Sequence, residues 1–192
     1  MGITARGARV SVEAHLDEIG FDAAREPFTV VGIGDMSGDV FGNGMLLSDQ
    51  IRLVAAFDHR HIFIDPDPDP DSSYAERRRL FELPASDWTS YNPNLISPGG
   101  GVYSRNSRRI PLSDQARARP GITAEGEWAR PDDVVRAILT APVTLLWNGG
   151  IGTYVKSSTE GHSDARDKAN DAVRVDATDL RCRSSARAAT RA

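Results

Sequence analysis

The stretch Phe28-Thr-Val-Val-Gly-Ile-Gly-Asp-Met-Ser-Gly-Asp-Val-Phe-Gly-Asn-Gly-Met45 joins an apolar strand to a glycine-rich turn and then to a segment that can become helical. A second apolar run, Arg52-Leu-Val-Ala-Ala-Phe57, follows and ends at Asp58, 26 residues after Gly32. Strand, glycine turn, helix and second strand in this order are typical of a unit that holds a dinucleotide pyrophosphate. The spacing Gly-x-Gly-x-x-x-Gly is one residue longer than the usual fingerprint, so a plain glycine-rich turn with a solvated Asp58 stays open as an alternative.

Each polar or glycine position of this unit has an expected role. Gly32 and Gly34 leave room for a tight turn and for close approach of the backbone to a ligand. Free N–H groups at the start of the helix, near Ser37 and Gly38, are expected to face the phosphates. Asp58 presents an acid to a ribose hydroxyl at the end of the second strand.

The composition is that of a soluble protein with one domain: 192 residues, 40% hydrophobic and 26% charged. No apolar run approaches the roughly 20 residues that cross a bilayer, and no secretory signal is evident, so we expect no membrane partner. The single cysteine, Cys182, excludes an internal disulfide and a multi-cysteine metal site. A cytoplasmic location is therefore expected.

The charge distribution argues against a nucleic-acid partner. The last twelve residues hold four arginines and no acid, so residues 1 to 180 carry a net charge of −8. A nucleic-acid binder needs a basic face to meet phosphate. The basic cluster Arg77-Arg-Arg79 lies beside acids and is interpreted as the solvated face of a helix.

An acidic run follows the nucleotide-type unit and resembles a calcium loop in spacing. Positions 1, 3, 5, 7, 9 and 12 of an EF-hand loop are matched by Asp65, Asp67, Asp69, Asp71, Ser73 and Glu76. The sixth position must turn sharply and is glycine in such loops, whereas this chain has Pro70 there. We therefore expect no metal, and interpret Ser73 and Glu76 as the capping box of a helix.

Periodicity and turn residues predict the other elements. Residues 8 to 20 are expected to form a helix, with Val12, Leu16 and Ile19 on its apolar face and Gly20 as its stop. Residues 59 to 64 are interpreted as a short extension of the sheet edge or a loop. Residues 84 to 112 show no sustained period and are expected to form an irregular insertion, packed through its aromatic residues Trp88, Tyr91 and Tyr103.

Near the end of the chain the α/β pattern repeats. Pro131 begins a predicted helix, and residues 142 to 147 form a predicted buried strand. The strand opens into Asn148-Gly-Gly150, for which a ligand-binding loop and a tight turn are both open.

Four segments resemble the large bacterial NAD-specific glutamate dehydrogenases: Val30-Val-Gly-Ile-Gly-Asp-Met-Ser-Gly-Asp-Val-Phe-Gly-Asn-Gly-Met45, Ala55-Ala-Phe-Asp-His-Arg-His-Ile-Phe-Ile-Asp-Pro66, Ser97-Pro-Gly-Gly-Gly-Val-Tyr-Ser104 and Leu145-Leu-Trp-Asn-Gly-Gly-Ile-Gly-Thr-Tyr-Val-Lys156. The resemblance covers residues 2 to about 182. It implies an α/β, Rossmann-like fold with a mostly parallel sheet and flanking helices, incomplete at both ends. It further implies oxidative deamination of L-glutamate to 2-oxoglutarate and ammonium with NAD, as part of amino-acid catabolism, by a homo-oligomeric parent enzyme.

The resemblance also assigns site residues. It implies that Gly32, Gly34 and Gly38 form the phosphate turn, that Asp58 is the adenosine-ribose acid, and that Asn148 contacts the nicotinamide ribose. The family's catalytic lysine and aspartate lie in a substrate domain that precedes Met1. We therefore assign no catalytic residue and expect the chain alone to be inactive. Its lysines, Lys156 and Lys168, lie in polar stretches that do not lower a pKa by burial.

The resemblance divides the chain into residues 1–27, a helical lead-in, residues 28–182, the NAD-binding domain, and residues 183–192, a tail. After an expected strand at Leu180-Arg-Cys182 the family continues Val-Val-Gly-Glu-Gly-Gly-Asn, whereas this chain reads Arg183-Ser-Ser-Ala-Arg-Ala-Ala-Thr190. One set of codons that can encode the observed residues is CGG TCG TCG GCG AGG GCG GCA ACC, and reading this set from the third base encodes the expected ones. We therefore expect a frameshifted, disordered tail.

Two other functions stay open at this point. One is a non-catalytic nucleotide-binding or assembly module of Rossmann type. The other is a different Rossmann amino-acid dehydrogenase. The reading frames that flank the coding sequence discriminate among the three.

Overall fold

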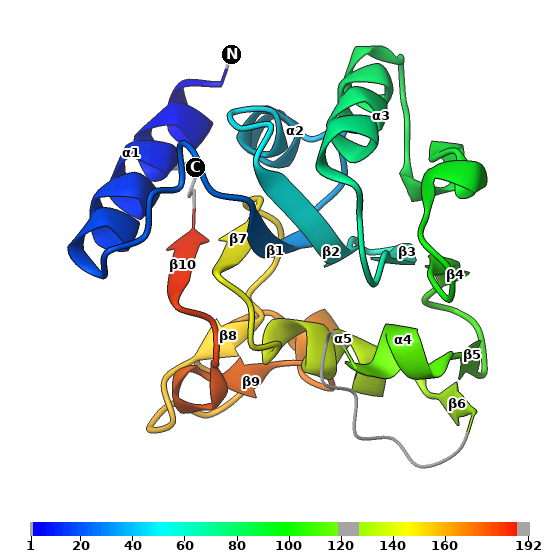
Figure 1. Ribbon diagram of the computed structural model, residues 1–192. Helices are drawn as coiled ribbons and strands as arrows, with labels where there is room; N and C mark the ends of the chain where they lie inside the picture. Colours follow the sequence, from blue (N-terminus) through cyan, green and yellow to red (C-terminus); the bar gives the residue numbers. More distant parts are fainter. Residues whose placement is uncertain (1, 119–126, 188–192) are drawn as a thin grey trace.

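A six-stranded mixed sheet forms the centre of the computed structural model, which describes residues 2–118 and 127–187 (Figure 1). The strand order is β10-β7-β1-β2-β3-β4. The strands are β1 (Phe28–Ile33), β2 (Ile51–Phe57), β3 (His61–Ile64), β4 (Gly101–Ser104), β7 (Leu145–Asn148) and β10 (Ser184–Arg187). Strands β10, β7, β1 and β2 run parallel, while β3 is antiparallel to both β2 and β4. The expected α/β class with a mostly parallel sheet and flanking helices is thus confirmed.

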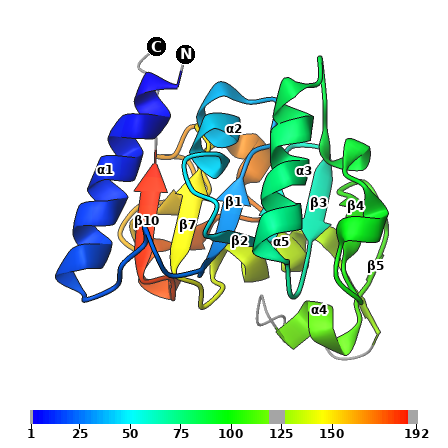
Figure 2. The ribbon, with the colours of Figure 1, turned by 45° about the horizontal axis from the view of Figure 1, so that its top comes forward.

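Helices cover both faces of the sheet (Figures 1 and 2). On one face lie α1 (Ile3–Glu18), α2 (Asp39–Met45) and α3 (Pro70–Glu82). On the other face lie α5 (Pro131–Leu139) and the two-stranded sheet of β8 (Val155–Lys156) and β9 (Val175–Asp176). Adjacent residues of β1 enter different cores, since Val30 packs with the α1 side and Val31 with the α5 side. A continuous apolar run such as that of β1 fits a parallel strand covered on both faces.

The remaining elements are short. They are the two-stranded sheet of β5 (Ile110–Pro111) and β6 (Trp128–Ala129), the helix α4 (Asp114–Ala118), and the 3₁₀ turns η1 (Trp88–Ser90), η2 (Pro93–Leu95), η3 (Lys168–Asn170) and η4 (Ala177–Asp179). In the described part of the chain, none of the helices has the length and apolar character needed to cross a bilayer.

The first helix starts earlier than its periodicity predicted, at Ile3 rather than near residue 8. Val12 and Leu16 are buried as expected, but Ile19 lies beyond the end of the helix and is 48% exposed. The predicted stop at Gly20 is confirmed: it adopts a φ of 75°. Glycine takes this left-handed conformation without steric cost, so it ends a helix readily.

The cap of α3 differs from the expected capping box. Asp69 is the N-cap, and its side chain accepts a hydrogen bond from the backbone N–H of Ser72. Ser73 instead accepts a bond from the guanidinium of Arg77, which is fully buried. The interpretation of Arg77 as part of a solvated face is therefore wrong. Three residues before Ser73, Pro70 already occupies the first helical turn, so the cap moves to the residue preceding the proline.

The segment from 84 to 112 is less irregular than expected. It contributes β4, which extends the main sheet, and β5. Trp88 and Tyr91 are buried, and the Trp88 ring stacks on that of Phe63 with a centroid separation of 4.7 Å. The aromatic packing predicted for this segment is confirmed for these two residues. Four-residue strands such as β4 carry too little periodicity to be recognised from the sequence.

The C-terminal segment is a strand where a disordered tail was expected. Residues 184 to 187 form β10, and Ser184 pairs with Leu145 while Arg187 pairs with Asn148. The strand expected at Leu180-Arg-Cys182 is absent, since this part of the described chain leads from η4 to β10 without regular structure. Backbone groups alone form a β-ladder, so the open edge of β7 can pair with a segment that lacks an apolar pattern. Residues 188–192 lie outside the described ranges.

Candidate functional site

The register of the parallel strands brings three of the expected site segments to one edge of the sheet. Ile33, the last residue of β1, pairs with Phe57 on one side and with Asn148 on the other. Gly34 and Asp58 therefore follow neighbouring strand ends, and Asn148 ends the third strand. Gly34 N–H donates to the Phe57 carbonyl over 2.7 Å, and Gly149 N–H donates to the Ile33 carbonyl over 2.8 Å. The predicted strand-helix-strand order, with Asp58 at the carboxyl end of the second strand, is confirmed.

The glycines of the turn make room for one aromatic ring. A Cβ at Gly32 would lie 2.3 Å from Phe41, and a Cβ at Gly34 would lie 2.9 Å from it. Gly149, in the loop after β7, would place a Cβ 2.7 Å from the same side chain. Gly34 also has a φ of 139°, which side-chain-bearing residues rarely adopt. The glycine pattern thus lets α2 pack closely on the strand ends through Phe41.

Trp88 contacts both the glycine turn and the Phe41 ring that packs on it. Its Nε1–H donates to the Gly34 carbonyl over 3.0 Å, and its ring meets that of Phe41 edge to face at 5.9 Å. A buried indole needs such an acceptor. The residue comes from η1, 54 positions later in the chain, so no local pattern linked it to the turn.

Ser37 and Gly38 are not free to face a ligand in this structure. Ser37 N–H donates to the Asp35 carboxylate over 2.9 Å, and Gly38 N–H donates to the Asp35 carbonyl over 3.2 Å. The expectation of two free N–H groups is therefore wrong. A short aspartate side chain two residues before an N–H commonly closes such a turn, and this competes with any anion for the Ser37 donor. A phosphate that takes the Ser37 N–H has to displace the Asp35 carboxylate.

Asp58 is fully buried and holds the turn between β2 and β3. Its Oδ1 accepts hydrogen bonds from the backbone N–H groups of Arg60 and His61, both at 2.6 Å. Its Oδ2 has no hydrogen-bond partner among the described residues and lies 3.9 Å from His61 Nδ1. One carboxylate oxygen is therefore structural, and the other is a buried acceptor without a hydrogen-bond donor among the described residues, so a ribose hydroxyl reaches it only if its surroundings open.

The arginine that adjoins Asp58 is Arg105. Its Nη1 donates to the Asp58 carbonyl over 3.0 Å, and its guanidinium carbon lies 5.9 Å from the centre of the Phe57 ring. Burial raises the pKa of Tyr154, and the nearby Arg105 opposes that rise. Arg60, the closer residue in sequence, extends instead toward Asp87, at 3.5 Å. Antiparallel pairing of β4 with β3 carries Arg105 to this edge, so its approach follows from sheet topology rather than from spacing.

Asn148 closes its own loop. Its Oδ1 accepts a hydrogen bond from Gly150 N–H over 3.0 Å, which supports the tight-turn interpretation. With neighbours from β7, β8 and β10 it lines a cavity of about 100 Å³. Pockets for drug-sized ligands measure roughly 300–1,000 Å³, so this cavity alone does not accommodate a dinucleotide. The described residues that line it are Ile33, Leu146, Asn148, Tyr154, Val155, Leu180, Ser185, Ala186 and Arg187.

The acidic run does not gather around a metal position. Asp69 caps α3, while Asp65 accepts hydrogen bonds from both the N–H and the hydroxyl of Ser97. Within residues 2–118 and 127–187, no group of three His, Cys, Asp or Glu side chains is arranged to hold a metal ion. Of the two lysines, Lys156 pairs with Asp176, and Lys168 is an exposed residue at the start of η3.

Comparison with known proteins agrees with the motifs. Residues 1–190 match the family described as bacterial NAD-glutamate dehydrogenase, catalytic domain. An NAD-specific glutamate dehydrogenase of Mycobacterium tuberculosis is 61% identical over 187 residues, covering 95% of this chain and 12% of the relative. Enzymes of the same name from Pseudomonas aeruginosa and Halomonas elongata are 55% and 53% identical over 183 residues, each covering 95% of this chain and 11% of the relative.

The matches cover nearly all of this chain but only a small part of each relative. The chain spans about one eighth of the length of the curated relatives that it matches. Because the family model covers almost every residue, membership does not depend on the glycine turn alone. The chain belongs to the bacterial NAD-glutamate dehydrogenase catalytic-domain family.

Proposed function

We propose that this chain supplies the cofactor-binding part of an NAD-dependent glutamate dehydrogenase, with a Rossmann-like fold. The observation that carries the proposal is the shared edge of three adjacent parallel strands, where Gly34 follows β1, Asp58 follows β2 and Asn148 ends β7. Ligands of open α/β sheets bind outside the carboxyl ends of such strands. The names of the relatives supply the cofactor, NAD, and the substrate, L-glutamate.

NAD supplies the chemistry of the reaction, since its nicotinamide accepts hydride from the α-carbon of glutamate as 2-oxoglutarate and ammonium form with water. The residues of this chain orient the cofactor. Asp58 would accept a hydrogen bond from an adenosine-ribose hydroxyl, and Asn148, which pairs with Ile33, would contact the nicotinamide ribose. The pyrophosphate would be held at the turn from Gly34 to Gly38, where the Ser37 and Gly38 N–H groups would become donors to it only once Asp35 releases them. The parent enzyme is proposed to be a cytoplasmic homo-oligomer without membrane or nucleic-acid partners.

Binding of NAD and of NADP to the purified chain, measured by calorimetry, tests this assignment. We expect NAD to bind more tightly, because the Asp58 carboxylate accepts the 2′-hydroxyl of NAD and repels the 2′-phosphate of NADP. Asp58→Asn keeps an oxygen acceptor for the Arg60 and His61 N–H groups and removes the charge, so it should narrow the preference by about tenfold, equivalent to roughly 1.4 kcal/mol. Asp49→Ser, at an exposed position before β2, is the matched control and should change neither affinity.

Preferred binding of NADP by the unmodified chain would contradict this role of Asp58. It would assign Arg105 to the 2′-phosphate, since its guanidinium already lies at the Asp58 carbonyl.

The rival function, a non-catalytic nucleotide-binding module, predicts no substrate-domain frame in the flanking DNA. A dehydrogenase predicts that frame upstream and the Val-Val-Gly-Glu-Gly-Gly-Asn frame downstream.

A further inference from the structure

Three arginines gather at one end of the two-stranded sheet of β5 and β6. Ile110 pairs with Ala129, and both are buried. Continuing this antiparallel register by one residue places Arg109 opposite Arg130, and both are exposed. Side chains alternate between the two faces of extended chains, so these arginines lie on the outer face, opposite to Ile110 and Ala129. Arg108, Arg109 and Arg130 line one hollow at the surface.

These arginines lack the partners that arginines elsewhere in the structure have. Arg9, Arg79, Arg136 and Arg174 each pair with an acid three or four residues away. Over residues 2–118 and 127–187, by contrast, Arg108, Arg109 and Arg130 form no side-chain hydrogen bond or ion pair. Asp133, a nearby acid, is taken by Arg136. Like charges directly opposite on paired strands are destabilising, so an anion between them would relieve a cost that the chain otherwise carries.

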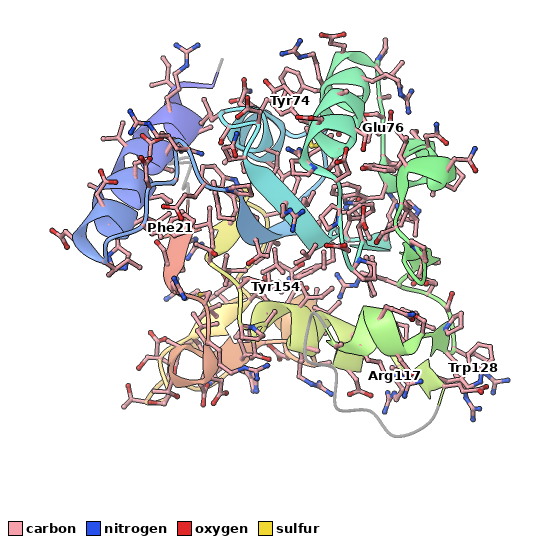
Figure 3. All side chains as sticks on the ribbon, in the orientation of Figure 1. Phe21, Tyr74, Glu76, Arg117, Trp128 and Tyr154 are labelled. Carbon is pink, nitrogen blue, oxygen red and sulfur yellow. The ribbon has the colours of Figure 1, made fainter. Side chains whose placement is uncertain are left out.

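Trp128 marks the same outer face. It pairs with Pro111, two residues along from the Arg109 position, and is 49% exposed. Figure 3 shows it projecting from β6 at the margin of the molecule. Residues 1 to 180 carry a net charge of −8. A patch of three unpaired cations therefore has the opposite sign to the net charge of this part of the chain.

We propose that Arg108, Arg109 and Arg130 form a binding site for phosphate groups. Guanidinium donors match the oxygens of a phosphate bidentately, and a multiply charged oxyanion neutralises several of them at once. The site does not rest on the proposed cofactor function, because the two-stranded sheet of β5 and β6 lies beyond β4, whereas the cofactor edge is formed by β7, β1 and β2 (Figure 1).

Pyrophosphate is the probe, titrated into the purified chain at constant ionic strength. Iodide quenching of tryptophan fluorescence reports the site selectively, because Trp88 and Trp147 are 0% and 1% exposed whereas Trp128 is 49% exposed. We expect pyrophosphate to reduce the quenching saturably. The double variant Arg109→Gln/Arg130→Gln should bind pyrophosphate more weakly, with a half-saturation concentration about tenfold higher or more, since two charge-assisted contacts are lost. Arg25→Gln, whose side chain is 85% exposed on another surface, should leave binding unchanged.

Thermal unfolding gives a second measurement that does not depend on fluorescence. Pyrophosphate should raise the melting temperature of the unmodified chain and not that of the double variant, which should be at least as stable without the anion because the opposed charges are gone. The proposal is overturned if the change in quenching depends on ionic strength alone, or if saturable binding of pyrophosphate persists in the double variant. Binding of poly-glutamate without binding of pyrophosphate also overturns it, in favour of an acidic polypeptide partner.

Discussion

Gly34→Ala should destabilise the chain much more than Gly38→Ala, although the sequence gives both glycines the same role. At Gly34 the new methyl group meets three Phe41 atoms at 2.9 Å, on a backbone whose φ is 139°. Left-handed strain costs about 1–2 kcal/mol, and overpacking adds roughly 1–3 kcal/mol. The expected loss of unfolding free energy is therefore about 2–5 kcal/mol.

Gly38 is the matched control. It has a φ of −73°, and a Cβ there would lie 3.4 Å from the Asp35 carbonyl, an ordinary contact. Alanine at this N-cap position should cost about 1 kcal/mol or less. Both substitutions restrict the unfolded chain equally, so that contribution cancels when the two variants are compared.

Urea and thermal unfolding followed by circular dichroism measure the difference. For a chain of this size each kcal/mol lowers the melting temperature by about 2–4 °C. We expect a loss of roughly 4–20 °C for Gly34→Ala and at most about 4 °C for Gly38→Ala. Equal stabilities, or a larger loss at Gly38, would refute the reasoning that Phe41 fixes the glycine requirement of the turn.

Three further predictions concern the polar interior and the activity. Burial raises the pKa of Tyr91 from 10.0 to about 12, so its contribution to stability is full below pH 10 and is lost as the pH rises toward 12. The stability difference between the unmodified chain and Tyr91→Phe should therefore shift by about 1.3 kcal/mol in favour of the variant between pH 9 and pH 11, measured by urea unfolding. Burial also raises the pKa of Asp65 above 3.8, and the hydrogen bonds from Ser97 partly oppose this rise. The charged form of Asp65 is therefore costly in the folded chain. Ser97→Ala should cost about 1–3 kcal/mol at pH 7 and less as the pH falls and Asp65 takes up a proton, and a cost that does not change with pH would show that Ser97 does not stabilise the carboxylate. Finally, the chain alone should give no glutamate-dependent formation of NADH at 340 nm, and measurable turnover would show that a catalytic residue lies within it.

Sequence alone determined the elements whose signals are local. The apolar runs of β1 and β2, the glycine turn between them and the proline that starts α5 were all recognised because each depends on residues near one another in the chain. The same patterns led to the family, which the comparisons confirm. Asp58 was placed correctly at the end of β2 for the same reason, since a strand end is defined by its own residues.

Tertiary structure decided what those residues contact. Phe41 and Trp88 give Gly34 its packing role, Arg105 reaches Asp58 from β4, and neither approach leaves a mark in local spacing. Arg77 lies among charges in sequence and is nevertheless buried, because the side of α3 that faces the sheet is set by where α2 and β2 lie. The strand β10 forms although its residues lack an apolar period, since the open backbone edge of β7 supplies the hydrogen bonds. Contacts between residues distant in the chain depend on the assembled sheet, and a linear pattern does not encode them.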